Sequence, residues 1–139
     1  NVEEVLAGCD NAIAVCLVQE HELTDRYPSY VEWHETHAGT RGIWNPIDDL
    51  SYPEFEEIFE FVSTLTDHLK NGQSLVVHCA AGIGRAGTTG TALLMMLGMN
   101  ATDALTHIRE HRPMAGPEAG TQRNFITDLG RHLMEQRGW

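Results

Sequence analysis

The chain has 139 residues, of which 42% are hydrophobic, and carries a formal net charge of -11 at pH 7. This is enough for one domain with its own core, which we expect to span residues 1–139, and too little for two ordinary domains. So acidic a chain lacks the basic face that attracts nucleic acid or anionic membranes, which excludes both as partners. It shows neither a membrane-spanning apolar run nor a secretory signal, so we expect a soluble, cytoplasmic protein.

Apolar patterning predicts strands that alternate with helices. In chain order we expect a buried strand (11–18), a short helix (29–39), a strand ended by Pro46 (41–49), an amphipathic helix (53–70), an apolar strand (74–79), a buried helix (88–98), a helix capped by Asn100 (101–111) and a last helix (120–136). This alternation predicts an α/β fold with a short, mostly parallel sheet flanked by helices. The strand at 74–79 is apolar on both faces, which favours a central position. Because the chain opens on Asn1 rather than Met, N-terminal strands could be missing.

The three cysteines are an odd number without the C-x-x-C spacing of structural zinc sites: Cys9, Cys16 and Cys79. We therefore expect a reducing compartment, no disulfide framework, and no metal or other cofactor. Cys16 is expected to fill the core, with a disulfide to Cys79 on oxidation as the alternative.

The stretch from His78 to Gly87 reads HCAAGIGRAG and joins a predicted strand to a predicted helix. In such a loop, the backbone amides and the helix N-terminus point at one centre, which makes an anion site. Small residues let the backbone approach phosphate oxygens, so the expected phosphate-binding residues are Ala80, Ala81, Gly82, Ile83, Gly84 and Arg85. The same amides favour the thiolate of Cys79, and the planar fork of Arg85 can hold two phosphoryl oxygens.

Two other motifs fit less well. Gly82, Gly84 and Gly87 spell G-x-G-x-x-G, but a dinucleotide site needs that motif after the first strand, with an acidic residue about 20 positions further on. Residues 107–111 match the H-x-x-E-H of a zinc-protease helix, but no third ligand suggests itself. Neither a nucleotide nor zinc is therefore expected.

The pattern His78-Cys79-x5-Arg85 resembles the signature of the cysteine-dependent protein tyrosine phosphatases, specifically their compact dual-specificity branch. The likeness extends over most of residues 11–134. Residues 18–53, which contain Pro-Ile-Asp-Asp, resemble the general-acid segment in the cyclin-dependent-kinase-associated type of this branch. Residues 101–126 resemble the family's last two helices.

The resemblance implies a role for several residues. Asp49 would protonate the leaving oxygen, with its neighbour Asp48 as the alternative, although such a pair also suits the start of the following helix. His78 would orient the loop. Gln122 would position the water of the second step, unless it is a solvated helix residue.

Ala86 departs from the family pattern, in which a Ser or Thr hydroxyl follows the arginine and stabilises the leaving thiolate. A methyl group cannot donate a hydrogen bond, so a slow second step is expected unless Thr88 or Thr89 substitutes. The loss of one such bond is worth roughly 1.5 to 3 kcal/mol.

We therefore expect a phosphatase that hydrolyses phosphotyrosine monoesters in proteins or peptides, with phosphoserine and phosphothreonine as further candidates, through a cysteinyl phosphate. One alternative is a catalytically impaired phosphoprotein-binding module. A phosphoinositide or inositol-phosphate phosphatase is another, although no lysine lies between Cys79 and Arg85. A sulfur-transfer or arsenate-reducing enzyme would keep its activity without Asp49. The sequence gives no indication of oligomeric state.

Overall fold

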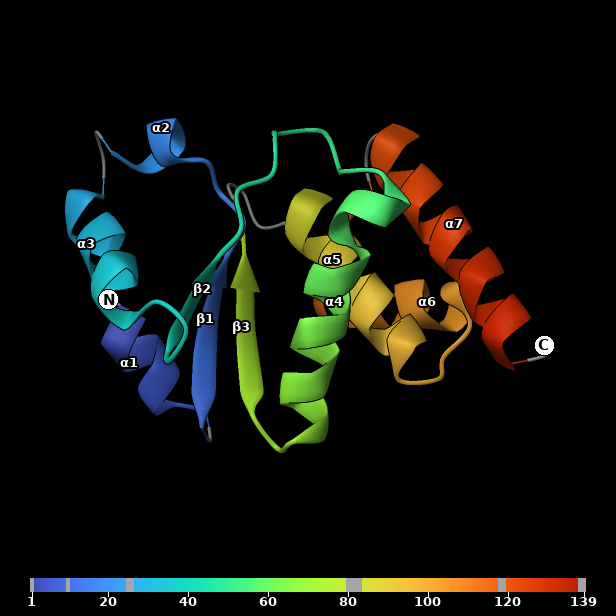
Figure 1. Cartoon of the computed structure of the whole chain (residues 1–139), viewed down its shortest axis with the longest axis horizontal. Coiled ribbons are helices and arrows are strands. Elements are labelled where there is room, and N and C mark those ends of the chain that lie inside the picture. The colour runs from blue at the N-terminus through green and yellow to red at the C-terminus, as the bar shows by residue number, and fades with distance from the viewer. Residues whose placement is uncertain (1, 10, 25–26, 80–83, 118–119, 138–139) are drawn as a thin grey trace.

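A computed structural model describes residues 2–9, 11–24, 27–79, 84–117 and 120–137. Strands and helices alternate along the chain (Figure 1), in the order α1 (Val2–Ala7), β1 (Ala12–Cys16), α2 (Glu20–Leu23), α3 (Pro28–His37), β2 (Gly42–Trp44), α4 (Phe55–Lys70), β3 (Ser74–His78), α5 (Gly84–Met96), α6 (Ala101–His111) and α7 (Gly120–Arg137). The predicted α/β class is therefore confirmed. The short helices α1 and α2 were not anticipated, because neither is long enough to show a helical repeat of apolar residues.

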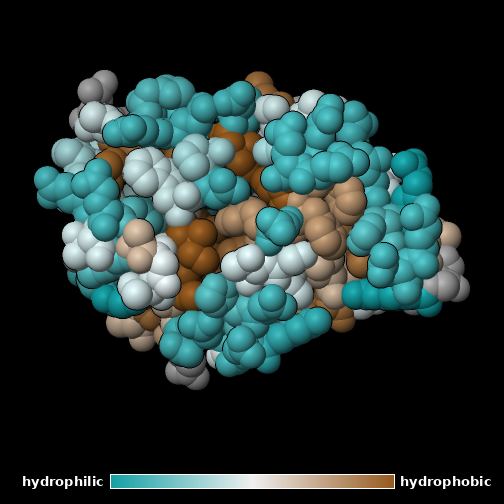
Figure 2. Space-filling view, viewed as in Figure 1, coloured by the Kyte–Doolittle hydropathy of each residue, from teal (hydrophilic) through white to brown (hydrophobic). Residues whose placement is uncertain are grey.

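The three strands form one parallel sheet in the order β2-β1-β3. The expectation that the strand over 74–79 is central is wrong for the described residues, because β1 takes that place. β1 is buried almost throughout, whereas every residue of β3 is half-buried. Figure 2 shows hydrophobic residues in the middle of the face where Figure 1 places β3, with hydrophilic residues around them. Apolar composition alone does not distinguish a central strand from an edge strand covered on both faces.

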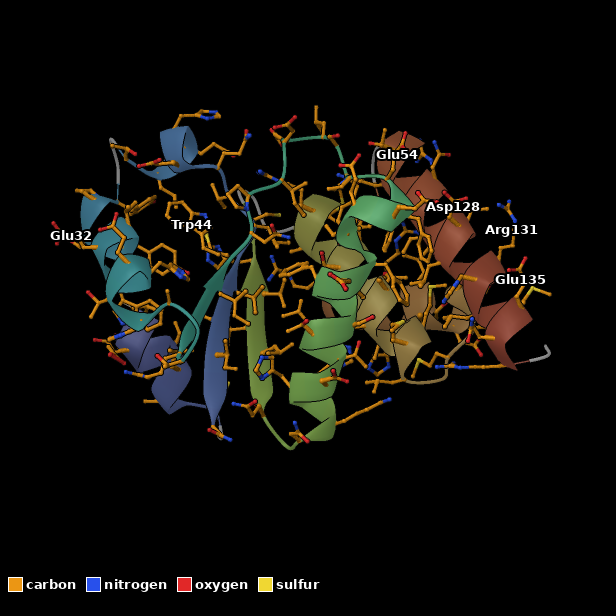
Figure 3. The ribbon with its side chains drawn as sticks, viewed as in Figure 1. Glu32, Trp44, Glu54, Asp128, Arg131 and Glu135 are labelled. Atoms are coloured by element: carbon orange, nitrogen blue, oxygen red, sulfur yellow. The ribbon has the colours of Figure 1, made fainter. Side chains whose placement is uncertain are left out.

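Helices cover the sheet from two sides (Figure 1): α1, α2 and α3 lie on one side, and α4 to α7 on the other. Helix α4 buries Ile58, Val62 and Leu65, three of the six apolar residues that recur every three or four positions along it, and the other three are half-buried. On α7 the labelled side chains of Asp128, Arg131 and Glu135 point away from the rest of the molecule (Figure 3). Its opposite stripe, with Phe125, Leu129 and Leu133, is buried in the core.

Two predicted helix starts can be compared with the structure. The Asn100 side chain accepts a hydrogen bond from the backbone N–H of Asp103 at 2.8 Å, which confirms the cap of α6. Helix α4 begins at Phe55 with Glu54 as its N-cap, so Pro53 precedes the helix instead of lying in its first turn.

Since the strands are parallel, their carboxyl ends meet at one edge of the sheet, where Figure 1 places α2, the segment 45–54 and the start of α5. Trp44, labelled in Figure 3, ends β2, and its indole N–H donates to the carbonyl of Val18 at 2.6 Å. This bond fastens the end of β2 to the chain leaving β1. The carboxyl ends of the strands are therefore held in place, and they bring together side chains that are distant in sequence.

None of the helices in the described ranges is both long enough and apolar enough to cross a membrane.

Candidate active site

Cys79 immediately follows β3 and is 8% exposed. The backbone N–H of Ala86, in the first turn of α5, donates to its Sγ at 3.3 Å. This contact places Cys79 Sγ at the N-terminal end of α5. Of the predicted phosphate-binding residues, Gly84 and Arg85 begin α5, whereas Ala80, Ala81, Gly82 and Ile83 lie outside the described residues.

Arg85 is 1% exposed and is held from two directions. Its Nη1 donates to Glu22 Oε2 at 2.9 Å and to the carbonyl of Ile47 at 2.7 Å, and its Nη2 donates to Glu22 Oε1 at 3.0 Å. Both hydrogens of Nη1 are therefore used by the protein. Burial alone would lower the pKa of the guanidinium, but the Glu22 carboxylate outweighs it and the pKa is raised. In turn, the hydrogen bonds from Arg85 lower the pKa of Glu22.

Glu22 was missed by sequence reasoning, because one glutamate in a short polar segment carries no signal. Its function is positional: it fixes the plane of the guanidinium, which is otherwise free to turn.

Glu22→Gln is expected to lower the free energy of unfolding at pH 7 by about 1.5 kcal/mol, because a bidentate ion pair becomes a single hydrogen bond from the Arg85 guanidinium to an uncharged amide oxygen. The folded-state pKa of Glu22 lies below its ordinary value of 4.5. Its stabilisation is therefore complete above that value and is lost as the pH falls through the lowered folded pKa. Urea titrations of both proteins from pH 7 to pH 3 test this. A gap between the proteins that stays constant below pH 4.5 would contradict it.

The adjacent carboxylates Asp48 and Asp49 face different partners. Asp49 Oδ1 lies 3.5 Å from Arg85 Nη2, and the Asp49 side chain is 65% exposed. Asp48 Oδ1 instead accepts a hydrogen bond from Gln19 Nε2 at 2.5 Å. A role at the start of α4 suits neither residue, because that helix begins at Phe55 and has its own acidic first turn.

His78 ends β3, and its Nε2 is 2.6 Å from the hydroxyl of Tyr30 on α3. Burial lowers the pKa of the His78 imidazole, which favours its neutral form. Tyr30 is thus a second contact that sequence reasoning missed, since it lies far from His78 in the chain.

Gln122 is fully buried, and its Nε2 donates to the carbonyl of Ser51 at 3.3 Å. The alternative of a solvated helix residue is therefore wrong. Nearby, the N–H of Tyr52 donates to Thr121 Oγ1 at 3.1 Å, which also ties α7 to the segment that carries Asp49.

Neither of the two candidates to replace the missing hydroxyl, Thr88 and Thr89, is hydrogen-bonded to Cys79 Sγ among the described residues. Thr88 Oγ1 donates to the carbonyl of Gly84 at 2.8 Å, and Thr89 Oγ1 to that of Arg85 at 3.0 Å. A hydroxyl has one hydrogen to donate, and here each is used within α5. Among the described residues, the hydrogen bond to Cys79 Sγ comes from a backbone amide.

Comparison with known proteins agrees with this geometry. Residues 3–126 match the family model described as "Swiss Army Knife protein, DSP-PTPase phosphatase domain". The chain therefore belongs to the dual-specificity type of the protein tyrosine phosphatase family. Its curated relatives include proteins named as tyrosine and dual specificity phosphatases.

Two relatives illustrate the range of similarity. The crystal structure of Tk-PTP in the active form is 32% identical and superposes with a TM-score of 0.76, covering 94% of this chain and 84% of that one. Protein phosphatase Slingshot homolog 3 of Rattus norvegicus is 26% identical over 99% of this chain, which spans only 21% of that protein's length.

The likeness to the cyclin-dependent-kinase-associated type holds at the level of the fold. Kinase associated phosphatase is 21% identical with a TM-score of 0.69, covering 98% of this chain and 75% of that one, so Tk-PTP shares more sequence. PTPMT1 in complex with PI(5)P likewise matches in fold, at 18% identity and a TM-score of 0.71, over 91% of this chain and 80% of that one.

Proposed function

We propose that this chain hydrolyses phosphotyrosine monoesters in proteins or peptides through a cysteinyl-phosphate intermediate. The observation that carries the proposal is that three groups lie together at the carboxyl end of the sheet. The Cys79 sulfur accepts a hydrogen bond from an N–H in the first turn of α5. The Arg85 guanidinium interacts electrostatically with Cys79 and lies 3.5 Å from Asp49 Oδ1.

In the first step the Cys79 thiolate attacks phosphorus, so that the S–P bond forms and the P–O bond to the tyrosine oxygen breaks. Asp49 gives its proton to that leaving oxygen. Arg85 and the amides of residues 80–84 would stabilise the charge on the three remaining phosphoryl oxygens. The exposure of Asp49 suits a group that must meet a substrate arriving from solvent.

In the second step a water attacks phosphorus, the S–P bond breaks and the thiolate leaves. Asp49, now ionised, accepts the proton of the water, and Gln122 orients it. The backbone N–H of Ala86 stabilises the departing sulfur, and no hydroxyl adds to it. We therefore expect this step to limit turnover.

A substitution pair tests the role of Ala86. Ala86→Thr restores a hydroxyl and is expected to raise the rate of the second step by about 10- to 100-fold. Ala86→Val, whose side chain has the shape of threonine but no hydroxyl, is not expected to raise this rate. Rapid mixing with p-nitrophenyl phosphate measures this rate. The wild type should release one fast equivalent of product before slow turnover, and Ala86→Thr should lose that burst. A wild type without a burst, or equal rates for the two variants, would contradict the assignment.

Another pair tests the function and the choice of acid. Asp49→Asn is expected to lower kcat by about 100-fold for phosphotyrosine peptides, whose leaving group needs a proton, and by less for p-nitrophenyl phosphate. Asp48→Asn is the matched control and should stay within about threefold of wild type, since its carboxylate bonds Gln19. Phosphate release from phosphotyrosine, phosphoserine and phosphothreonine peptides and from phosphoinositides measures these effects. Activity that survives in Asp49→Asn and Cys79→Ser would overturn the proposal.

The same panel decides between the remaining candidates. The buried Arg85, and the lack of a side-chain hydroxyl at Ala86, also suit a module that binds phosphoproteins without releasing phosphate. Such a module would bind phosphotyrosine peptides yet give no more than one equivalent of phosphate. The fold shared with PTPMT1, whose structure holds PI(5)P, keeps a lipid phosphatase in the comparison. That enzyme would release phosphate from phosphoinositides faster than from any peptide.

A further inference from the structure

Three side chains of metal-ligating types from separate elements lie close together near the carboxyl ends of the strands. They are Cys16 at the end of β1, His34 on α3 and His78 at the end of β3. One donor atom from each lies within 4.8 Å of the other two. The strand register explains part of this, because Cys16 and His78 are direct partners across the parallel pair. Such partners project their side chains from the same face of a sheet.

His34 has no explanation in the proposed reaction. It is 2% exposed, and neither ring nitrogen has a hydrogen-bond partner among the described residues. Its ring is packed against Tyr30, Trp33 and Trp44, with centroid distances of 4.6, 5.1 and 5.9 Å. Such a buried polar ring costs folding free energy, so a histidine here calls for a ligand.

One thiol and two imidazoles are the donors that zinc and related borderline-soft cations prefer. In a tetrahedral zinc site, Zn–S bonds of about 2.3 Å and Zn–N bonds of about 2.0 Å separate the donor atoms by roughly 3.3 to 3.6 Å. Since no separation here exceeds 4.8 Å, the longest must close by at most about 1.2 to 1.5 Å when a cation binds. We propose that Cys16, His34 and His78 form a binding site for a zinc-like divalent cation, with the fourth position left to water.

The protonation states suit such a site. Burial lowers the pKa of His34 to about 4, so its imidazole is neutral and able to ligate at pH 7. Burial also raises the pKa of the Cys16 thiol to about 11. On binding, the S–H bond breaks, the S–metal bond forms and the proton goes to solvent, so affinity should rise about tenfold per pH unit.

The groups that face Cys16 are Tyr30 and His34 on α3, His78 on β3, Glu22 on α2 and Arg85 on α5. Glu22 and Arg85 act on Cys16 in opposite directions and are paired with each other.

Of the three proposed ligands, His78 lines a cavity of about 930 Å³. Tyr30, Trp33, His78 and Cys79 are among its lining residues. Cys79 is not one of the proposed ligands, so the site stands whether or not the chain is a phosphatase.

Cobalt(II) is the probe, because a cysteine thiolate bound to cobalt gives a charge-transfer band in the near ultraviolet. The reduced wild-type chain should show this band at one equivalent, and zinc should displace the cobalt. Cys16→Ala should lose the band. His34→Phe, which keeps a ring among its aromatic neighbours, should weaken binding by roughly 100-fold or more. Persistence of the band in Cys16→Ala, or no band in the wild type, would overturn the proposal.

Two controls separate this site from others. Cys79→Ser should keep the band, because the reactive sulfur is not a ligand. His107→Gln with His111→Gln should also keep it, since this exposed pair on α6 is the obvious adventitious chelator. Loss of the band in either control would count against the cluster.

The folded state of each variant is checked by thermal unfolding. Zinc should raise the unfolding midpoint of the wild type and of both controls, and should leave that of Cys16→Ala unchanged. If zinc stabilised Cys16→Ala as much as the wild type, the ion would bind elsewhere and the proposal would fail.

Discussion

Arg85→Lys is expected to lower kcat/KM for p-nitrophenyl phosphate by about 10³-fold. The Arg85 side chain bonds both oxygens of Glu22 and the Ile47 carbonyl, and in the proposed reaction also holds two phosphoryl oxygens. Lysine has three donors on a single nitrogen, so it cannot satisfy Glu22 on one side and an oxyanion on the other. Steady-state kinetics with both proteins measures the effect.

Arg41→Lys is the matched control for this substitution. Arg41 also pairs with a glutamate, Glu3, but its side chain is 45% exposed and lies on another part of the surface. Exchange of Arg for Lys there should change stability by less than about 0.5 kcal/mol and leave kcat/KM as it is. An Arg85→Lys protein that is folded and within tenfold of wild type would refute the assigned role of the guanidinium.

Gly87→Ala is expected to lower the free energy of unfolding by about 3 kcal/mol. A Cβ atom at this position would lie 2.5 Å from the backbone nitrogen of Gly116 and 2.9 Å from its oxygen. Neither atom belongs to a flexible side chain, so α5 and the segment before α7 must move apart. Urea denaturation followed by circular dichroism measures the loss.

Gly130→Ala provides the opposite expectation. Gly130 also lies inside a helix, but its added Cβ would meet only the end of the Met95 side chain, at an ordinary 3.7 Å. Alanine in a helix is favoured over glycine by roughly 0.5 to 1 kcal/mol, so this variant should gain stability. If both variants shifted in the same direction, the close approach at Gly87 would not be the cause.

Features with a local cause could be predicted from the sequence. The spacing of Ile58, Val62 and Leu65 predicted α4 and its buried face, and Asn100 predicted the start of α6. The order of β3, Cys79 and α5 follows from the same kind of pattern, because an apolar strand before Cys79 and an apolar helix after it are visible in the sequence.

Contacts between distant segments could not be predicted in this way. Glu22 and Arg85 are far apart in sequence, and so are Tyr30 and His78. Only the parallel register of β1 and β3 brings these segments together, and one sequence does not encode register in its composition. The place of β3 at the edge was missed for a related reason, since strand order depends on pairing energies summed over the whole sheet.

The hydrogen bonds of Arg85 also decide how an anion can dock. Since one terminal nitrogen of the guanidinium gives both hydrogens to Glu22 and Ile47, only the remaining flank is left to serve as a receptor. In the proposed reaction the phosphate ester would bind along that flank, where Asp49 Oδ1 lies 3.5 Å from Nη2. Because Arg85 offers donors on one flank only, it should bind planar or tetrahedral oxyanions much more tightly than spherical halide ions of the same charge.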